Sequence, residues 1–336
     1  MIRAVCCSVA RRPITRRKQE SNMRRLLCAA TMLCAAVAVG QAHAADRGIA
    51  VIVKTANSNY WQNVRKGAAD AVAKVENYTM TFQGPTSESA VADQVNMVAD
   101  AVTQKVAAIV LAPSDPDALV PSIRKAWEAH IPVVLIDSMI SDSGAKYYQS
   151  FLATDNEAAG EALGKEMVDH VGQTGKVAIM SYVPGVGSEI GRVGGFRKYI
   201  AEHSHIQIVG PFYSQSQMAL AMNQTTDVLA SNPDLKGIFA ANEMTAVGVG
   251  RAIQQAGKSG KLYAIAFDGN EDEQGFVRSG TFQLLAVQGS YAMGAKGVET
   301  AIGVLTGAKP TKYVNTGVVF VTSANLDSPE AKQVLY

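Results

Sequence analysis

Cysteine is absent from most of this chain. Its four cysteines, Cys6, Cys7, Cys28 and Cys34, all lie within the first 34 of 336 residues. If that N-terminal stretch is removed, as its pattern predicts, the remaining protein has neither a thiol nor a disulfide. Cysteine-based catalysis, thiolate metal sites and a disulfide-stabilised fold are therefore excluded for the rest of the chain.

Apolar runs long enough to cross a membrane are also lacking near the N-terminus. Residues 26–39 are apolar but too few to span a bilayer comfortably. Arg24 and Arg25 precede them, directly after Met23, and Ala42-His43-Ala44 follows. A charged start, a short apolar centre and a small-residue end are typical of a signal peptide. We therefore predict that residues 1–44 are removed and that a soluble protein is exported; translation starts at Met1 or Met23, and a buried N-terminal helix is the alternative.

Excess positive charge is confined to the same segment. The whole chain has 31 Lys and Arg and 29 Asp and Glu, of which eight and one lie in residues 1–44. Residues 45–336 therefore carry 23 and 28, a net charge of −5. A net negative charge gives no electrostatic case for binding nucleic acid. At 292 residues this part also exceeds one comfortable core, which predicts two domains.

Catalytic and metal-binding motifs are missing as well. The histidines after residue 44, namely His130, His170, His203 and His205, lack a metal-ligand spacing with a carboxylate. No Gly-x-Ser-x-Gly follows a predicted strand. The glycines around 185–191 resemble a dinucleotide fingerprint, but the spacing is one residue too long. We predict no cofactor, no metal and no enzymatic activity.

What the chain does have is a regular alternation of short apolar runs and amphipathic segments. Continuously apolar strands joined by helices are typical of parallel sheets covered on both faces. The pattern predicts strands at 48–54, 78–83, 107–112, 132–137, 176–182, 206–212 and 237–241, and helices at 60–75, 88–104, 117–130, 157–171, 189–203 and 218–231. The alternation restarts after Ala153, which indicates two successive β/α halves and hence two similar lobes.

Polar residues follow several of these strands, follow two further apolar runs that predict strands at 263–267 and 282–287, or begin the next helix. They are Asp137, Arg192, Asn242, Asp268 and Gln288. Ligands of open α/β sheets bind outside the carboxyl ends of the strands. If the two carboxyl edges face each other, these side chains line one cleft. Carboxylates, a guanidinium and carboxamides together suit a ligand that both donates and accepts hydrogen bonds, such as a sugar or polyol.

No flexible Gly/Ser linker separates the halves. Short extended crossings near Thr154, Gln288 and Gly317 are predicted instead, and such crossings suit hinge motion. This places residues 45–154 plus 289–317 in an N-terminal lobe and residues 155–288 plus 318–336 in a C-terminal lobe.

Several segments carry a family resemblance in order and spacing. They are Ile131-Pro132-Val133-Val134 before Asp137, Thr154-Asp155-Asn156, Arg192-Val193-Gly194-Gly195-Phe196, Asn242-Glu243-Met244 with Ala246-Val247-Gly248, Ala266-Phe267-Asp268-Gly269, and Gly294-Ala295-Lys296-Gly297-Val298-Glu299-Thr300. Beyond residue 44 the whole chain resembles the ribose-binding-protein-like group of periplasmic sugar-binding proteins, which serve ATP-driven importers. The resemblance implies two Rossmann-like lobes with parallel sheets, a three-stranded hinge, a monosaccharide or polyol held between the lobes, and delivery to a membrane permease from the periplasm. We expect a monomer.

The same resemblance implies roles for individual residues. Asp137 and Arg192 would hold ring hydroxyls, Asn242 and Asp268 would do so from the second lobe, and Gln288 from the hinge. Ser58, Tyr60 and Trp61 would supply a polar contact and aromatic stacking partners. Ser138 stands where the ribose binders have arginine, and Ser58 where they often have asparagine. The pocket therefore differs from that of the ribose binders, and the identity of the sugar stays open.

Other interpretations remain open at this stage. Either Asp137 or Asp268 alone would more often cap a turn, and Arg192 alone would more often lie on the surface. Lys54 is expected to be a solvated strand end, with a role in the site as the alternative. Glu189 is expected to be solvated, with contact to a ligand amine as the alternative. At the level of function, the alternatives are a ligand carrier for a chemoreceptor, a sugar-processing enzyme using Asp137 and Asp268 as a carboxylate pair, and a repressor, which would need an N-terminal DNA-binding motif.

Overall fold

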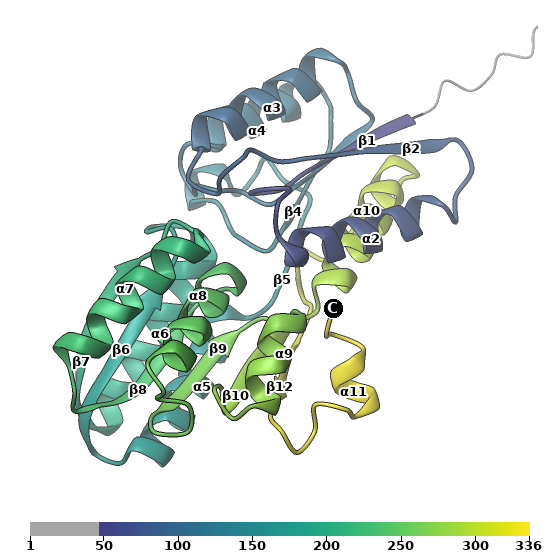
Figure 1. The fold of residues 1–336 in the computed structure, drawn as a ribbon. Helices are drawn as coiled ribbons and strands as arrows, with labels where there is room; N and C mark the ends of the chain where they lie inside the picture. Colours follow the sequence, from purple (N-terminus) through teal and green to yellow (C-terminus); the bar gives the residue numbers. More distant parts are fainter. Residues whose placement is uncertain (1–46) are drawn as a thin grey trace, which may run out of the picture. The chain divides into compact units, whose positions relative to one another are not determined.

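The strands of the chain form two separate six-stranded sheets. In the computed structural model, which describes residues 47–336, both sheets are parallel except that β12 runs antiparallel to β10 (Figure 1). In spatial order the first sheet contains β11 (Tyr313–Asn315), β5 (Ser150–Ala153), β4 (Val133–Ile136), β3 (Ala108–Leu111), β1 (Arg47–Ile52) and β2 (Tyr78–Gln83). The second contains β12 (Val318–Val321), β10 (Leu284–Gln288), β9 (Tyr263–Phe267), β8 (Leu235–Ala240), β6 (Thr174–Ser181) and β7 (His205–Tyr213). The predicted α/β class is confirmed.

Each sheet carries its own helices (Figure 1). The first sheet packs with α2 (Asn59–Val72), α3 (Val91–Thr103), α4 (Val120–Glu128) and α10 (Ser290–Leu305), and η1 (Asp142–Gly144) is a short 3-10 helix beside α4. The second packs with α5 (Asn156–Val171), α6 (Gly187–His203), α7 (Met218–Ser231), α8 (Glu243–Gln255), α9 (Glu271–Arg278) and α11 (Pro329–Lys332). We call each sheet with its helices the first lobe and the second lobe.

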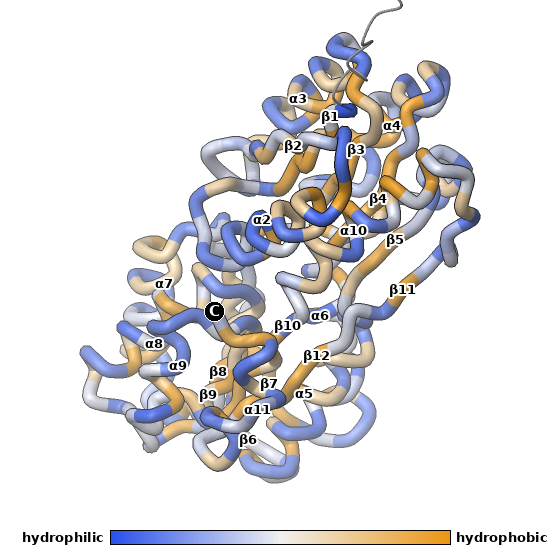
Figure 2. Tube along the Cα trace, turned by 90° about the vertical axis from the view of Figure 1, so that its right-hand side faces the viewer, coloured by the Kyte–Doolittle hydropathy of each residue, from blue (hydrophilic) through white to orange (hydrophobic). Residues whose placement is uncertain are grey.

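The core of each lobe lies on both faces of its sheet. Along β1, Ile49 and Val51 belong to one hydrophobic cluster, whereas Ala50 and Ile52 belong to another on the opposite face. This division follows from the two-residue period of a strand, which directs successive side chains to opposite faces. Figure 2 shows the result, with hydrophobic strands covered by helices whose outer sides are hydrophilic.

Two helix pairs approach closely because glycines face the neighbouring backbone. A Cβ atom on Gly67 of α2 would lie 2.0 Å from the Tyr291 carbonyl oxygen of α10, and one on Gly294 of α10 would lie 2.0 Å from the Val64 carbonyl oxygen of α2. In the second lobe, Gly160 of α5 and Gly195 of α6 make the same reciprocal contact. Any larger residue would force these helices apart.

Three crossings connect the two lobes, at Thr154-Asp155, Gly289 and Thr316-Gly317. They lie against one another. Thr154 Oγ1 donates to the Gly317 carbonyl oxygen at 3.0 Å, and a Cβ atom on Gly289 would lie 2.9 Å from the Thr316 carbonyl oxygen. A bundle of short adjacent segments can bend together, which is the usual geometry of a hinge.

The sequence patterns did not predict every element. The strand β5 was missed because it begins with the polar Ser150 and offers only three consecutive apolar residues, Phe151 to Ala153. The strands β11 and β12 are also too short for a pattern to be recognised. Helix α3 begins at Val91 rather than at Glu88, because Glu88 lies in the preceding loop and uses its carboxylate in contacts described below.

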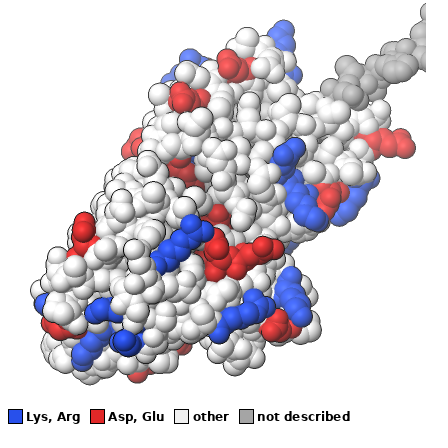
Figure 3. All heavy atoms as spheres, in the orientation of Figure 1, with Lys and Arg blue, Asp and Glu red and all other residues white. Residues whose placement is uncertain are grey.

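Charged side chains of both signs are interspersed on the face drawn in Figure 3. Exposed ion pairs include Lys198 with Glu161 at 2.6 Å and Arg251 with Asp272 at 3.1 Å. Pairs of this kind contribute about 0–1 kcal/mol each, so burial of the apolar strands holds the fold together.

The predicted signal peptide, its cleavage before Ala45 and the choice between Met1 and Met23 lie outside the described residues. Between residues 47 and 336, no helix is both long enough and apolar enough to cross a membrane.

Candidate functional site

A polar cavity that is partly open to solvent lies between the carboxyl ends of the two sheets, and the empty space in it, solvent included, is about 330 Å³. Both lobes contribute to its wall. From the first lobe come Lys54, Ser58, Tyr60, Trp61, Glu88 and Asp137, and from the second Tyr182, Ser188, Arg192, Asn242, Glu243, Met244, Asp268 and Gln288.

Eight of the nine residues singled out from the sequence line this cavity. They are Ser58, Tyr60, Trp61, Asp137, Arg192, Asn242, Asp268 and Gln288. The ninth, Ser138, lies directly behind the wall, where it is 1% exposed and donates to Asp137 Oδ2 at 2.9 Å. The structure thus brings together side chains that are up to 230 positions apart in the sequence.

Both aspartates occupy the same strained position in their lobes. Asp137 follows β4 with φ of 64°, and Asp268 follows β9 with φ of 82°. Residues other than glycine seldom adopt positive φ, and such strain is concentrated at functional sites. Neither carboxylate caps the turn that follows it. Asp137 instead accepts from Lys54, Tyr60 and Ser138, and Asp268 from Glu243 and Gln288.

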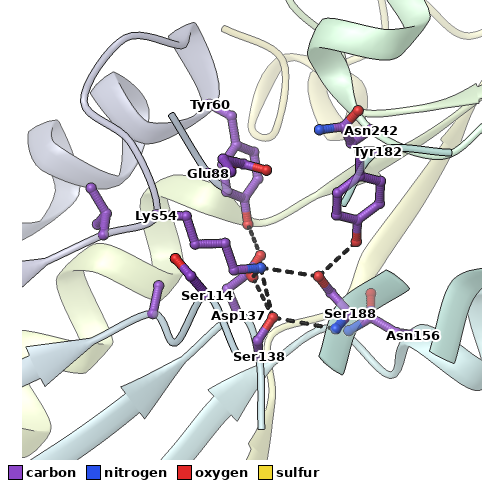
Figure 4. Close-up of polar contacts among 12 residues, drawn as sticks. Lys54, Tyr60, Glu88, Ser114, Asp137, Ser138, Asn156, Tyr182, Ser188 and Asn242 are labelled. Atoms are coloured by element: carbon purple, nitrogen blue, oxygen red, sulfur yellow. Dashed lines mark hydrogen bonds and ion pairs between the residues drawn. The ribbon is translucent and has the colours of Figure 1, made fainter. Parts of the chain in front are cut away.

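Lys54 is buried at the centre of a polar network (Figure 4). Its Nζ donates to Asp137 Oδ2 at 2.6 Å, to Ser138 Oγ at 2.7 Å and to Ser188 Oγ at 3.1 Å. The last contact crosses from the first lobe to α6, where Tyr182 also bonds Ser188 at 2.7 Å. Burial alone would raise the pKa of Asp137, but the positive charges of Lys54 and Arg192 outweigh it and lower that pKa.

The expectation that Lys54 is solvated was therefore wrong. Lys54 follows β1 and Asp137 follows β4, and in the sheet only β3 lies between these two strands. Because the strands are parallel, both side chains lie at the same edge of the sheet, where they form an ion pair. The signal that selected Asp137, a polar residue directly after an apolar strand, was also present at Lys54. A buried cation at that edge is satisfied by the carboxylate beside it.

Glu189 was also expected to be solvated, and it is 4% exposed. Its carboxylate accepts from Ser181 Oγ at 3.0 Å and from the Gly185 backbone N–H at 3.3 Å, both within the second lobe. Burial raises the pKa of Glu189. It does not belong to the cavity wall.

Arg192 is held from behind by its own lobe. Its Nε donates to Asn156 Oδ1 at 2.8 Å, its Nη1 donates to the Ala241 carbonyl oxygen at 2.9 Å, and the guanidinium lies 4.1 Å from the centre of the Phe267 ring. Among residues 47–336, none accepts a hydrogen bond from Nη2. That nitrogen of a cavity-lining side chain is therefore available to a ligand.

Gln288 and Asp268 form a second polar pair. Gln288 Nε2 donates to Asp268 Oδ1 at 2.8 Å, while Gln288 Oε1 is buried and has no partner among the described residues. Burial raises the pKa of Asp268 although Arg192 opposes the shift. A buried carbonyl oxygen without a donor is costly, so Gln288 Oε1 is suited to accept a hydrogen bond from a ligand.

Two glutamates of the cavity wall were not identified from the sequence. Glu88 accepts from Trp61 Nε1 at 2.9 Å and, across the lobes, from Ser216 Oγ at 2.5 Å. Glu243 reaches from α8 to the start of α2 in the first lobe. Glu88 lies in the loop between β2 and α3, five residues after the end of the strand, and the pattern placed it at the start of a helix. Glu243 follows Asn242 as an ordinary first helical residue. Both contacts depend on how the lobes meet, which no local pattern records.

The start of α6 also meets the first lobe directly. The Ser188 backbone N–H donates to Ser138 Oγ at 3.3 Å, and a Cβ atom on Gly187 would lie 3.0 Å from the Met139 carbonyl oxygen. Within residues 47–336, no group of three or more His, Cys, Asp or Glu side chains is arranged to hold a metal ion.

Comparison with known proteins gives consistent matches over most of the chain. A family model described as periplasmic binding protein domain matches residues 49–309. The ribose import binding protein of Escherichia coli (strain K12) is 27% identical over 288 residues, which are 86% of this chain and 95% of that protein. The D-allose-binding periplasmic protein of the same organism is 28% identical over 258 residues, 75% of this chain and 83% of that protein.

Solved structures extend the similarity. An ABC transporter solute binding protein from Agrobacterium vitis with bound D-fucose is 66% identical, covers 86% of this chain and 100% of its own, and has a TM-score of 0.85. A carbohydrate transporter solute binding protein from Agrobacterium radiobacter in complex with D-arabinose is 32% identical, covers 87% of this chain and 99% of its own, and has a TM-score of 0.82.

Proposed function

Since this chain belongs to the periplasmic binding protein domain family, we propose that it captures a neutral monosaccharide or polyol between its lobes, with D-fucose the first candidate, and delivers it to an ABC importer. Its relatives are transport binding proteins, not enzymes. The observation that carries the proposal is the polar cavity lined by both lobes, because every predicted contact residue at it is 8% exposed or less.

The charges around the cavity favour an uncharged ligand. Lys54 is already paired with Asp137, and Arg192 lies opposite the negative charges of Asp137 and Asp268, which raise its pKa further although burial lowers it. Glu88 and Glu243 add two more acidic groups. A sugar phosphate or sugar acid would bring another negative charge into this enclosed site, where uncompensated charge is very unfavourable.

The available hydrogen-bonding groups suit hydroxyls. Gln288 Oε1 needs a donor, Arg192 Nη2 needs an acceptor, and each sugar hydroxyl can act as either. Asn242 Oδ1 accepts hydrogen bonds from Thr245, and one Nδ2 hydrogen is donated to Ser216 Oγ. The second Nδ2 hydrogen is available to the ligand. Leaving a buried group of this kind unpaired costs about 1–3 kcal/mol, so the wrong epimer is discriminated against.

Apolar side chains complete the wall. Trp61 packs edge-on against Tyr60 at 4.9 Å, and Met244 lies on the opposite lobe. The C–H face of a sugar ring packs well on aromatic surfaces. D-fucose carries a methyl group where galactose carries a hydroxymethyl group, and such a methyl group gains from contact with Trp61 or Met244. The 66% identical protein with bound D-fucose supports this choice of first candidate.

The remaining assignments stay proposals. The lobe boundaries at 45–154 plus 289–317 and 155–288 plus 318–336 are supported by the sheet to which each segment contributes its strands. A periplasmic location is supported by the relatives and by the predicted signal peptide. Monomeric behaviour and contact with a chemoreceptor remain predictions of the sequence.

A ligand screen tests the proposal. The protein is expressed from its full-length sequence, purified from the secreted fraction, and heated with D-fucose, D-galactose, D-arabinose, D-ribose, D-allose, inositols and linear polyols. A ligand present at 100 times its Kd adds about 2.7 kcal/mol of stability, which gives a clear rise in Tm. We expect the largest rise with D-fucose.

The matched control is Asp268→Ala, which removes a ligand contact proposed for the second lobe. The variant should fold and should show no rise in Tm with the same sugar. No response to any of the sugars or polyols would contradict the proposed function. A response to another sugar would correct the ligand and leave the class intact.

A further inference from the structure

Glu243 joins the two lobes by capping a helix that belongs to the other one. Its Oε2 accepts from the Tyr60 backbone N–H at 2.6 Å, and its Oε1 accepts from the Asn59 backbone N–H at 3.1 Å. Both donors are at the start of α2 in the first lobe, whereas Glu243 begins α8 in the second. Ser58 caps the next N–H of α2 from within the first lobe. Two free N–H groups at that helix start are thus satisfied only across the lobes.

Tyr336 strengthens the same contact. Its hydroxyl donates to Glu243 Oε2 at 3.1 Å, and its ring lies 6.3 Å from that of Tyr60. Tyr60 in turn donates its hydroxyl to Asp137 Oδ1 at 3.0 Å inside the cavity. Glu243 therefore fixes the backbone of a residue whose side chain reaches the proposed sugar site.

These contacts exist only while the lobes are closed. The cavity wall is buried, so a sugar enters or leaves only when the lobes separate. Separation pulls α8 away from α2 and returns the Glu243 carboxylate to water. Closure has the opposite effect, because it moves that carboxylate into a site where Glu243 is 3% exposed.

We propose that Glu243 is a positioning residue that clasps the lobes and makes closure over the sugar a proton-coupled step. The proposal rests on the proposed function, since it requires a ligand that drives closure. The proposed role of Glu243 adds a regulation of the same site, in which the pH of the surroundings changes the affinity for the sugar.

The electrostatics give the direction of the coupling. Burial raises the pKa of Glu243 to about 7, and the negative charge of Asp268 contributes, while the bonds from Tyr60, Tyr336 and Asn59 oppose the shift. In the open form the carboxyl group returns toward its ordinary pKa of about 4.3. Between about pH 4.3 and about pH 7, Glu243 is therefore mostly protonated in the closed form and mostly ionised in the open form, so closure takes up a proton. Sugar affinity is greatest at the acidic end of this window and falls as pH rises through it.

The other groups that face Glu243 reinforce this sign. Asp268 in the loop after β9 and Glu273 on α9 are acidic, and Tyr60 on α2 and Tyr336 are uncharged donors. The cations of the cavity, Lys54 and Arg192, make their hydrogen bonds to other residues. Among these neighbours, only the hydrogen bonds and the N-terminal ends of α2 and α8 favour a negative charge on Glu243.

Calorimetric titration with D-fucose between pH 5 and pH 8 tests the proposal. The wild-type protein should bind several-fold more tightly at pH 5.5 than at pH 7.5, with a slope no steeper than about tenfold per pH unit. Titrations at pH 6 in two buffers of different ionisation enthalpy count the protons directly. We expect uptake of up to one proton per sugar.

Two substitutions of Glu243 distinguish its proton uptake from the hydrogen bonds by which it joins the lobes. Glu243→Gln keeps a carbonyl acceptor for Tyr60 but cannot titrate, so its affinity should be nearly independent of pH and its proton uptake close to zero. Glu243→Ala removes the clasp and should bind more weakly at every pH. Glu189→Gln is the matched control, because Glu189 is a buried acid of the same lobe whose partners do not change on closure; it should keep the wild-type slope.

The possible failures are distinguishable. If the sugar affinity of the wild-type protein does not vary with pH, the proposed role of Glu243 is wrong. The same holds if Glu243→Gln keeps the pH dependence of the wild-type affinity. In both cases the proposed sugar binding is unaffected. Absence of binding by every sugar at every pH overturns the proposed function and the clasp with it.

Discussion

The guanidinium of Arg192 is fixed by two hydrogen bonds and the Phe267 ring, all within the second lobe. Lysine offers one compact ammonium group and no planar fork. We expect Arg192→Lys to leave Asn156 or Ala241 without its donor and to weaken sugar binding by about 1–3 kcal/mol, on the order of tenfold to a hundredfold in Kd. Calorimetric titration measures the change. Arg197→Lys, the same substitution at an exposed position of α6, should leave Kd unchanged, and an equal loss there would contradict the argument.

Individual residues also show what the sequence could and could not predict. Asp137, Asp268 and Gln288 were predicted because each ends or follows an apolar strand, and the carboxyl edge of a sheet collects such positions. Lys54 carried the same signal and was set aside, since a lysine after a strand is usually solvated. Glu88 does not directly follow an apolar strand, so it showed no such signal, and its partners Trp61 and Ser216 are brought to it only by folding.

At the scale of elements, the pairing of α5 with α6 sets the position of Arg192. A Cβ atom on Gly160 of α5 would lie 2.3 Å from the Arg192 carbonyl oxygen. Gly160→Ala should therefore push α6 outward, cost about 1–3 kcal/mol of stability and weaken sugar binding as well. Urea unfolding and calorimetric titration measure the two effects. Gly194→Ala on α6 meets nothing within 4 Å and should be neutral or slightly stabilising, so a similar loss there would argue against the close packing.

Elements with a clear period or a continuous apolar run were predictable, and those with shorter runs were not. The strand β2 and the helix α7 have the bounds expected from their patterns. The strands β3 and β4 are as short as β5 but consist of apolar residues only, whereas β5 begins with Ser150 and so shows a shorter apolar run. Its position in the sheet comes from pairing with β4 and β11, which is information from distant parts of the chain.

For the whole molecule, the important property is that both lobes line the proposed sugar site and that three short crossings join them. Contacts with both lobes are available only in the closed form, so the sugar shifts the population toward it. We expect the radius of gyration from small-angle scattering to fall when D-fucose is added to saturation. Asp268→Ala should show no change at the same sugar concentration. Tight binding without any change in scattering would show that closure is not coupled to the ligand.

The facing of the two carboxyl edges was predictable in outline, since each β/α half places its site at the same edge. The contacts that hold the lobes together were not. Glu243 and Glu88 bond residues of the opposite lobe, and their partners depend on the angle at which the lobes meet.

The start of α6 also lies against Met139 of the first lobe, and nearby Ile190 is 56% exposed. Residues 45–336 contain no cysteine, so in a protein prepared without residues 1–44 the substitution Ile190→Cys provides a single thiol for a dye. Opening and closing would change the surroundings of that dye and hence its brightness. The protein can thus be turned into an optical sensor that reads sugar concentration without a second reagent.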